Sequence, residues 1–176
     1  MNKPMLLTDY CGTNVRGWLM SEKLDGWRVM WDGQNFFSRE LGWLAAPEWF
    51  KAGMPAVALD GELFAGRGEF NAIQGMMRDG WHGLTFRVFD TIAPGAYSIR
   101  LRTIKALALP AHASVVEQVE ISTTLDVIRA ADAIVAAGGE GVVVRNPKGK
   151  YLPGERTNDV VRWVPQDPAK NRRKSA

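Results

Sequence analysis

Three short segments of this chain share the feature that most constrains its fold, an acidic residue beside a glycine at the border of a strand-like stretch. They are residues 21–28 (Ser-Glu-Lys-Leu-Asp-Gly-Trp-Arg), 59–63 (Leu-Asp-Gly-Glu-Leu) and 139–145 (Gly-Glu-Gly-Val-Val-Val-Arg). Glycine lets the backbone turn where other residues are strained. The pattern therefore predicts short strands whose polar ends can point into a cleft.

The first half of the chain reads as a series of short β segments. Residues 27–31 alternate between two faces, Asp32-Gly33 is a strong turn signal, and residues 36–39 begin a return strand. Further strands are predicted over residues 57–64 and 85–90. Between these two we expect a loop and then a short helix.

The second half contains the clearest helix, predicted from about Thr124 to Ala137. Its apolar residues keep helical spacing, Ser122 to Thr124 offer N-caps, and Gly138-Gly139 ends it. A buried strand is predicted at residues 142–144 and a last strand at residues 159–164. The whole pattern indicates an α+β fold with mainly antiparallel strands and helices packed outside.

Composition is that of one globular domain. The chain has 176 residues, of which 46% are hydrophobic and 23% are charged. It lacks an apolar run of about 18 residues, so we expect no membrane span. Cys11 is the only cysteine, which rules out an internal disulfide and favours a reducing compartment. His82 and His112 are far apart and have no cysteine neighbours, which argues against a zinc site.

The positive charge is concentrated at one end of the chain. Lys170, Arg172, Arg173 and Lys174 supply four of the 22 basic groups, and without them 18 basic residues face 19 acidic ones. We therefore expect a nearly neutral domain over residues 1–165 and a basic flexible tail over residues 166–176. Such a tail suits attraction to a phosphate backbone, and equally suits a plain solvated terminus.

The three acidic segments also carry the residue types that a nucleotide-transfer reaction needs. A lysine amine can attack the α-phosphate of a nucleotide when carboxylates hold the ribose and a metal ion. Lys23 stands at a predicted strand end, although a lysine before a turn is by itself more often solvated. Its amine must lose its proton to react, through desolvation or nearby positive charge.

The order of these motifs identifies a family. The sequence contains K-x-D-G-x-R at residues 23–28, D-G-E at 60–62, F-D at 89–90 and E-G-V-V-V-R at 140–145. This order resembles that of the motifs in the nucleotidyltransferase domain of ATP-dependent DNA ligases. The motif residues themselves are most similar to those of the small bacterial and phage enzymes. The resemblance implies an α+β nucleotidyltransferase (ATP-grasp-like) domain of mainly antiparallel sheets flanked by helices.

The resemblance also implies roles for nucleotide-binding residues. Lys23 matches the nucleophile that forms a lysine–AMP bond, and Ser21 the position that reads the adenine edge. Glu62 matches the carboxylate on the ribose hydroxyls, and Phe89 the aromatic ring under the purine. Arg28 matches the arginine that holds the ribose and the surroundings of the lysine.

Three further residues follow from the same comparison. Glu140 resembles the carboxylate that supports the catalytic Mg²⁺ or Mn²⁺ and contacts the nucleotide. Asp25 matches the acid of the first motif, where turn formation and ribose contact are both open roles. Arg39, in Ser38-Arg39, resembles the arginine that grips the 5′-phosphate of a nick, with a plain surface arginine as the alternative.

The last family motif is altered in this chain. Residues 151–165 resemble Y-x-x-G-R-S-x-x-L-L-K-x-K-P, with one residue inserted before Arg156. Arg162 stands where the first lysine is expected and keeps the charge, whereas Val164 replaces the second lysine and does not. Because those lysines neutralise the α-phosphate in the family, we expect slower adenylate formation or transfer.

The chain stops about ten residues after that motif, whereas family ligases continue into an OB-fold domain. We therefore expect either a natural single-domain protein or a fragment, with a separate protein or domain supplying the OB-fold. The resemblance implies a monomeric enzyme in the cytoplasm of a bacterium or a phage-infected host, acting on nicked double-stranded DNA with ATP. Two other readings stay open, an RNA ligase or capping-type nucleotidyltransferase, and a nick-binding module with impaired catalysis.

Overall fold

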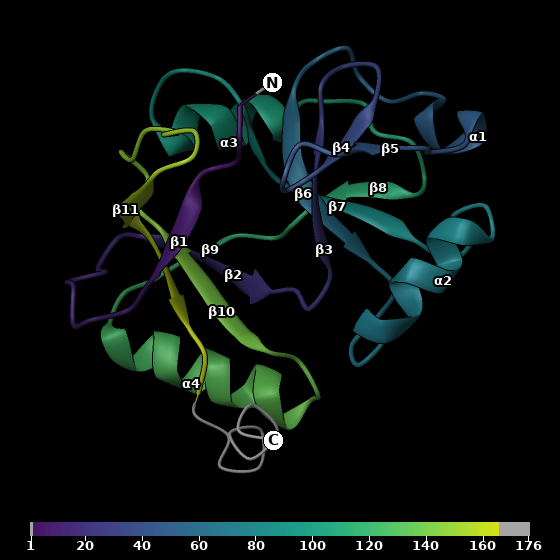
Figure 1. Cartoon of the computed structure of the whole chain (residues 1–176). Coiled ribbons are helices and arrows are strands. Elements are labelled where there is room, and N and C mark those ends of the chain that lie inside the picture. The colour runs from purple at the N-terminus through teal and green to yellow at the C-terminus, as the bar shows by residue number, and fades with distance from the viewer. Residues whose placement is uncertain (1, 166–176) are drawn as a thin grey trace.

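The computed structural model describes residues 2–165 and contains two β-sheets that lie next to each other (Figure 1). The first sheet has the strand order β1-β11-β10-β2-β9, and the second has the order β5-β4-β3-β6-β7-β8. The strands of the first sheet are β1 (Leu6–Asp9), β2 (Leu19–Lys23), β9 (Val119–Glu120), β10 (Gly141–Arg145) and β11 (Arg156–Trp163). Those of the second are β3 (Trp27–Trp31), β4 (Phe36–Ser38), β5 (Trp43–Leu44), β6 (Leu59–Phe64), β7 (Thr85–Thr91) and β8 (Ala113–Val115).

The helices lie on the outside of these sheets. They are α1 (Glu48–Lys51), the 3₁₀ turn η1 (Phe70–Ala72), α2 (Ile73–Arg78), α3 (Tyr97–Lys105) and α4 (Thr124–Ala136). Helix α4 packs against β10, β2 and β11 of the first sheet, and α3 packs against β7 of the second (Figure 1). No helix among residues 2–165 has the length and apolar character needed to cross a bilayer.

Strand pairing confirms the predicted α+β fold with mainly antiparallel strands. The exceptions within residues 2–165 are the parallel pairs β1–β11 and β7–β8. Strand β3 has the predicted bounds, and α4 ends one residue before the predicted end. The α4 N-terminus is a capping box, in which Thr123 and Asp126 bond each other's backbone N–H groups.

Strand β11 and helix α3 are two of the elements that differ from the sequence predictions. Strand β11 begins at Arg156, three residues before the predicted start, because its first part pairs with β1 near the N-terminus. Helix α3 was not predicted at all. Its buried face contains Tyr97, Leu101 and Ile104 at helical spacing, but Arg100 is buried with them and interrupts the apolar pattern.

Strand β10 has one face that packs into a hydrophobic core and an opposite face that carries polar side chains. Val142 and Val144 pack into the core under α4, whereas Val143 lies in a different cluster on the opposite face. Because side chains alternate along a strand, Arg145 shares the face of Val143. The neighbouring strand β2 is in register, with Val143 opposite Ser21. This face of the first sheet thus collects polar side chains from both strands.

Candidate active site

A cavity of about 590 Å³ lies between the two sheets, which is within the usual size range of ligand pockets. All nine predicted site residues line it: Ser21, Lys23, Asp25, Arg28, Arg39, Glu62, Phe89, Glu140 and Arg162. They come from β2 and β11 of the first sheet and from β3, β6 and β7 of the second, whereas Asp25, Arg39 and Glu140 lie in segments between elements. The fold therefore brings together motifs that are distant in the sequence.

Lys23 and Glu140 form an ion pair in this cavity. Lys23 ends β2, directly opposite Gly141 of β10. The Lys23 Nζ atom lies 2.6 Å from Glu140 Oε2, and the two side chains keep 18% and 27% of their surface exposed. Both groups are thus shielded but still reachable from the cavity. The lysine must leave this carboxylate before its amine can act as a nucleophile.

Gly26 allows the segment after Lys23 to cross from the first sheet to the second. A Cβ atom at this position would lie 2.3 Å from the Leu63 carbonyl oxygen and 2.7 Å from Glu62 Cγ. Such distances are far below van der Waals contact, so a larger residue would push the segment away from β6. The glycine serves a close approach of two backbones here, rather than the tight turn that the sequence suggested.

The glycine after Glu140 has a similar role with an additional constraint. Gly141 has φ +151°, and a Cβ atom there would lie 2.4 Å from the Trp163 carbonyl oxygen. The position is therefore restricted to glycine by conformation and by space. This fixes the backbone that carries Glu140 against the end of β11.

A buried polar cluster supports the second-sheet wall of the cavity. Arg28 donates from Nε and a terminal nitrogen to the two oxygens of Asp60, at 3.0 and 2.6 Å, and the Tyr151 hydroxyl donates to Asp60 at 2.7 Å. Burial disfavours the charged form of Arg28, but the neighbouring Asp60 carboxylate outweighs it and raises the Arg28 pKa. Burial also raises the pKa of the Tyr151 hydroxyl. The guanidinium of Arg28 is thus bound to the carboxylate of Asp60.

Glu62 lies beside this cluster, on β6 opposite Arg28 of β3. Burial in the cavity wall raises the pKa of its carboxyl group to about 8, although the positive charges of Arg28 and Lys23 act in the opposite direction. The group is therefore poised to change protonation near neutral pH. Binding of a hydrogen-bond donor or a cation would favour the carboxylate form.

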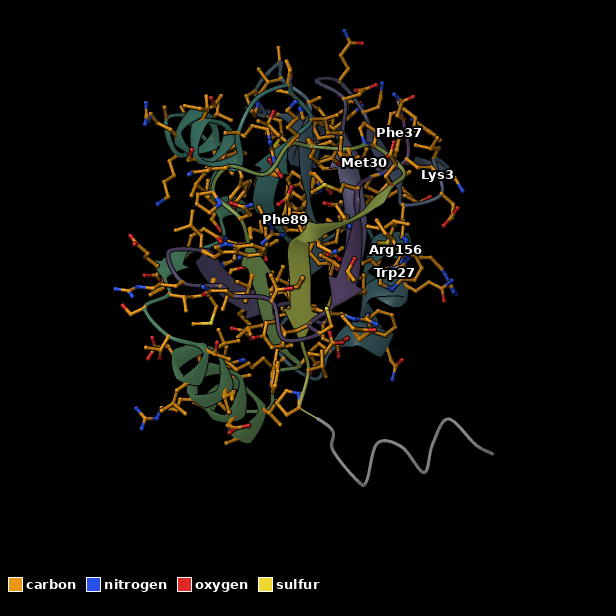
Figure 2. All side chains as sticks on the ribbon, turned by 90° about the vertical axis from the view of Figure 1, so that its left-hand side faces the viewer. Lys3, Trp27, Met30, Phe37, Phe89 and Arg156 are labelled. Carbon is orange, nitrogen blue, oxygen red and sulfur yellow. The ribbon has the colours of Figure 1, made fainter. Side chains whose placement is uncertain are left out.

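Phe89 forms part of the interior of the site, near the centre of the molecule in Figure 2. The guanidinium carbons of Arg28 and Arg145 lie 5.3 and 5.0 Å from its ring centroid. Ser21 is buried and accepts a hydrogen bond of 3.2 Å from Arg145. The ring and the hydroxyl thus occupy the inner part of the cavity.

The remaining predicted residues contribute to the cavity lining as well. Asp25 belongs to the segment that links β2 to β3. Arg39 follows β4 and has no ion pair within residues 2–165. Arg162 Nε lies 2.5 Å from Asp9 Oδ1, and this arginine lowers the pKa of the Asp9 carboxyl. Val164 is exposed, and residues 166–176, which include the predicted basic tail, lie outside the described part of the chain.

Sequence reasoning missed three residues of the site. Asp60 was seen only as a charged strand end, and Tyr151 only as the start of a motif. Arg145 was seen as the last letter of a motif and had no role assigned, yet it lines the cavity. Their importance comes from burial and from partners in other strands, which no local pattern indicates.

The residues present suit a divalent cation that binds together with phosphates. Within residues 2–165 no group of three or more His, Cys, Asp or Glu side chains could hold a metal ion alone. Mg²⁺ in nucleotide sites commonly uses one or two carboxylates together with substrate phosphates and water. Glu140 is a carboxylate of this kind, which lines the cavity and is partly exposed.

Comparisons with known proteins identify the family of this arrangement. The model of the ATP dependent DNA ligase domain matches residues 88–163. A DNA ligase of Haemophilus influenzae is 36% identical over 155 residues, which cover 84% of this chain and 58% of that protein. The chain thus spans a little over half the length of this curated relative.

Solved structures show the same fold. A structure from a study of Lig E DNA ligases is 26% identical with a TM-score of 0.86, covering 93% of this chain and 69% of that one. The Chlorella virus DNA ligase-adenylate is 19% identical with a TM-score of 0.72, covering 93% and 67%. The bacteriophage T7 ATP-dependent DNA ligase is 15% identical with a TM-score of 0.73, covering 94% and 69%. With the matched family model and the curated relative, these likenesses show that the chain belongs to the ATP-dependent DNA ligase family and has the fold of its nucleotidyltransferase domain.

Proposed function

We propose that this chain is the catalytic domain of an ATP-dependent DNA ligase, which forms an AMP adduct on Lys23 and seals nicks in DNA. The observation that carries the proposal is the joint placement of Lys23, Glu62, Phe89 and Glu140 around one cavity between the sheets. A lysine nucleophile, two carboxylates and an aromatic ring are the groups that nucleotidyl transfer to a side chain requires.

The first chemical step takes place at Lys23. Its Nζ atom leaves the ion pair with Glu140, loses a proton, and attacks the α-phosphorus of ATP. A phosphorus–nitrogen bond forms while the bond from that phosphorus to the pyrophosphate oxygen breaks, so pyrophosphate leaves with the bonding electrons. The two groups lie 2.6 Å apart, which places Glu140 where it can pass the lysine proton on to water and return to its carboxylate form.

The other cavity residues hold the nucleotide for this attack. Phe89 offers its ring to the base, Ser21 contacts the edge of the base, and Glu62 accepts hydrogen bonds from the ribose hydroxyls. Arg28 acts through Asp60, because both carboxylate oxygens of Asp60 bind its guanidinium. In this proposal Arg28 keeps the wall that carries Glu62 rigid, and Asp25 supports the segment after the nucleophile.

Glu140, once free of Lys23, is the side chain that would hold Mg²⁺ or Mn²⁺ beside the phosphates. When bound, the cation neutralises charge on the phosphate oxygens. Arg162 lies at the same cavity and adds a positive charge from the protein. Because Arg162 also forms an ion pair with Asp9, its attraction to the phosphate is weaker than that of an unpaired arginine.

Nick sealing follows from the adduct. The 5′-phosphate of a nick takes AMP from Lys23, and the adjacent 3′-hydroxyl then displaces AMP to form the phosphodiester bond. Arg39 is the candidate contact to the 5′-phosphate, because it lines the cavity without an ion pair within residues 2–165. Phosphate contacts of this kind are independent of sequence and weaken with salt. The proposal also includes that the protein is a monomer and acts in the cytoplasm. A separate domain or protein would supply the OB-fold.

The test combines nucleotide labelling with nick sealing. We expect radiolabelled ATP, but not GTP, to label the wild-type chain, and nicked DNA rather than nicked RNA to be joined. The variant Lys23→Ala should lose both activities, while the control Lys105→Ala, at an exposed helix residue, should keep them. Labelling by GTP would instead favour a capping-type enzyme. Nick binding without any labelled protein would favour a binding module and contradict the proposal.

A further inference from the structure

An ion pair between Arg67 and Glu22 joins a loop of the second sheet to the first sheet, close to the reactive lysine. Arg67 lies in the loop between β6 and η1, and Glu22 lies in β2 next to Lys23. The Arg67 Nε atom lies 2.8 Å from Glu22 Oε1, and a terminal nitrogen lies 2.9 Å from Glu22 Oε2. The two side chains keep 37% and 25% of their surface exposed. A bidentate pair of this kind fixes the orientation of both groups as well as their distance.

Arg67 has a third contact at the end of helix α4. Its other terminal nitrogen donates to the Ala137 carbonyl oxygen at 3.2 Å. Ala137 is the C-cap of α4, and carbonyl groups at this end of a helix lack partners within the helix. A positive charge there also interacts favourably with the helix dipole. Figure 1 shows the same arrangement, with the loop before α2 next to the last turn of α4.

The Glu22 carboxylate also lies against the backbone that carries Glu140. Side chains alternate along β2, so Glu22 points to the face opposite that of Lys23. A Cβ atom at Gly139 would lie 2.9 Å from Glu22 Oε1. Gly139 is buried and directly precedes Glu140. The carboxylate that Arg67 binds is thus in contact with the segment that leads into Glu140.

These contacts connect the segments that carry three charged groups of the proposed reaction. Strand β2 carries Lys23, the segment after α4 carries Glu140, and β6, directly before the Arg67 loop, carries Glu62. All three side chains line the cavity between the sheets. A shift of one segment changes the distance between the lysine and a bound nucleotide. A misplacement of about 1 Å can slow a reaction about hundredfold.

We propose that Arg67 and Glu22 are positioning residues for the step in which Lys23 bonds to the α-phosphorus of ATP and pyrophosphate leaves. Their ion pair keeps the end of β2 and the segment before Glu140 in place against the loop after β6. In this role neither side chain touches the reacting atoms. The inference rests on the proposed function, because it concerns the rate at which Lys23 takes AMP from ATP.

The test measures the rate of adduct formation in a single turnover at several ATP concentrations with Mg²⁺. In Arg67→Met and in Glu22→Met, we expect the maximal rate constant to fall about ten- to hundredfold, because the lysine and Glu140 lose their fixed places. The ATP concentration at half of the maximal rate should stay near the wild-type value, since Phe89 and Glu62 lie within other strands. Urea denaturation should show nearly unchanged stability, because a partly exposed ion pair contributes little to it.

A double variant tests whether the two residues act through one contact. The variant with both Arg67→Met and Glu22→Met should be no slower than the slower single variant, since either change already breaks the pair. Arg67→Lys keeps the charge but loses the planar fork, so its rate should lie between those of the wild type and Arg67→Met. Arg102→Met, at an exposed arginine of α3 that does not line the cavity, is the matched control and should react like the wild type. If a methionine variant does not fold, Arg67→Lys and Glu22→Gln are judged by the same criteria.

The outcomes separate this inference from the function on which it rests. A wild-type rate constant in the Arg67 and Glu22 variants overturns the inference and leaves adduct formation on Lys23 intact. It is also overturned if the losses multiply in the double variant, if only the half-saturating ATP concentration changes, or if stability falls together with the rate. Absence of an AMP adduct on the wild type overturns the proposed function, and this inference with it.

Discussion

Asp60 shows how a single buried side chain organises the site. It is fully buried, and its oxygens accept hydrogen bonds from Arg28 and from the Tyr151 hydroxyl. Because a buried carboxylate loses its contact with water, each of these donors replaces hydration that the unfolded chain has. Removal of a single donor is therefore expected to lower the free energy of unfolding more than the same change at the surface does.

Substitution Tyr151→Phe tests this expectation. It removes the hydroxyl that donates to Asp60 and should lower the free energy of unfolding by about 1–3 kcal/mol. Urea denaturation measures the change. Tyr10→Phe is the matched control, since its hydroxyl makes no hydrogen bond within residues 2–165, and should shift stability by less than about 0.5 kcal/mol. Equal effects of the two substitutions would show that Asp60 does not depend on Tyr151.

Glu62 makes stability depend on pH in a predictable direction. Its pKa is raised from 4.5 to about 8 in the folded chain, mainly by burial. A carboxyl group with a raised pKa stabilises the fold below its unfolded pKa and loses this contribution as pH rises through the folded value. The free energy of unfolding of the wild type, relative to Glu62→Gln, should therefore fall between pH 4.5 and 8. Parallel stability profiles for the two proteins would contradict the shift.

At this scale the sequence predicted the residues whose motifs occur in a recognisable order. Lys23, Glu62, Phe89 and Glu140 were all candidates before the structure, and all line the cavity. Arg145 and Tyr151 were not, because their partners Ser21 and Asp60 lie 124 and 91 positions away in the sequence. Such contacts depend on strand pairing, which local patterns do not specify.

At the scale of elements, the link between β2 and β3 joins the two walls of the cavity. The substitution Gly26→Ala would place a methyl group 2.3 Å from the Leu63 carbonyl oxygen. We expect the link to shift away from β6, with a loss of stability and a slower AMP transfer to Lys23. Chemical denaturation and single-turnover labelling with ATP measure the two effects.

Gly75→Ala provides the control for this prediction. Gly75 lies in α2, and an added Cβ atom there meets no neighbouring atom within 4 Å. Because alanine favours helices more than glycine does, this variant should be as stable as the wild type or slightly more so. A Gly26→Ala variant that behaves like Gly75→Ala would contradict the close approach of the link to β6.

Elements with a regular pattern were predictable, and those defined by tertiary contacts were not. Strand β3 and helix α4 follow alternation and helical spacing with clear end signals. Helix α3 was missed because Arg100 is buried on its inner face, where it binds Asp90 through two hydrogen bonds of 2.8 and 3.0 Å. Strand β8 is short and pairs in parallel with β7, so it carries little signal of its own.

At the scale of the whole molecule, each sheet has its own hydrophobic core, and the cavity lies between them. Periodicity predicted strands and helices but could not show that two sheets form the opposite walls of a site. The motif order and its likeness to a known family predicted mainly antiparallel sheets flanked by helices, but not how two sheets enclose the cavity. The structure shows how they do so, since the segment after Lys23 passes directly from one sheet to the other.

The central claim is that Lys23 reacts with ATP inside this cavity. The most direct measurement is the intact mass of the chain after incubation with ATP and Mg²⁺, followed by mapping of the modified peptide. The account predicts that the mass of the wild type increases by one AMP, that the adduct is on Lys23, and that Lys23→Ala remains unchanged. An unmodified wild-type chain, or an adduct that persists in Lys23→Ala, would contradict it.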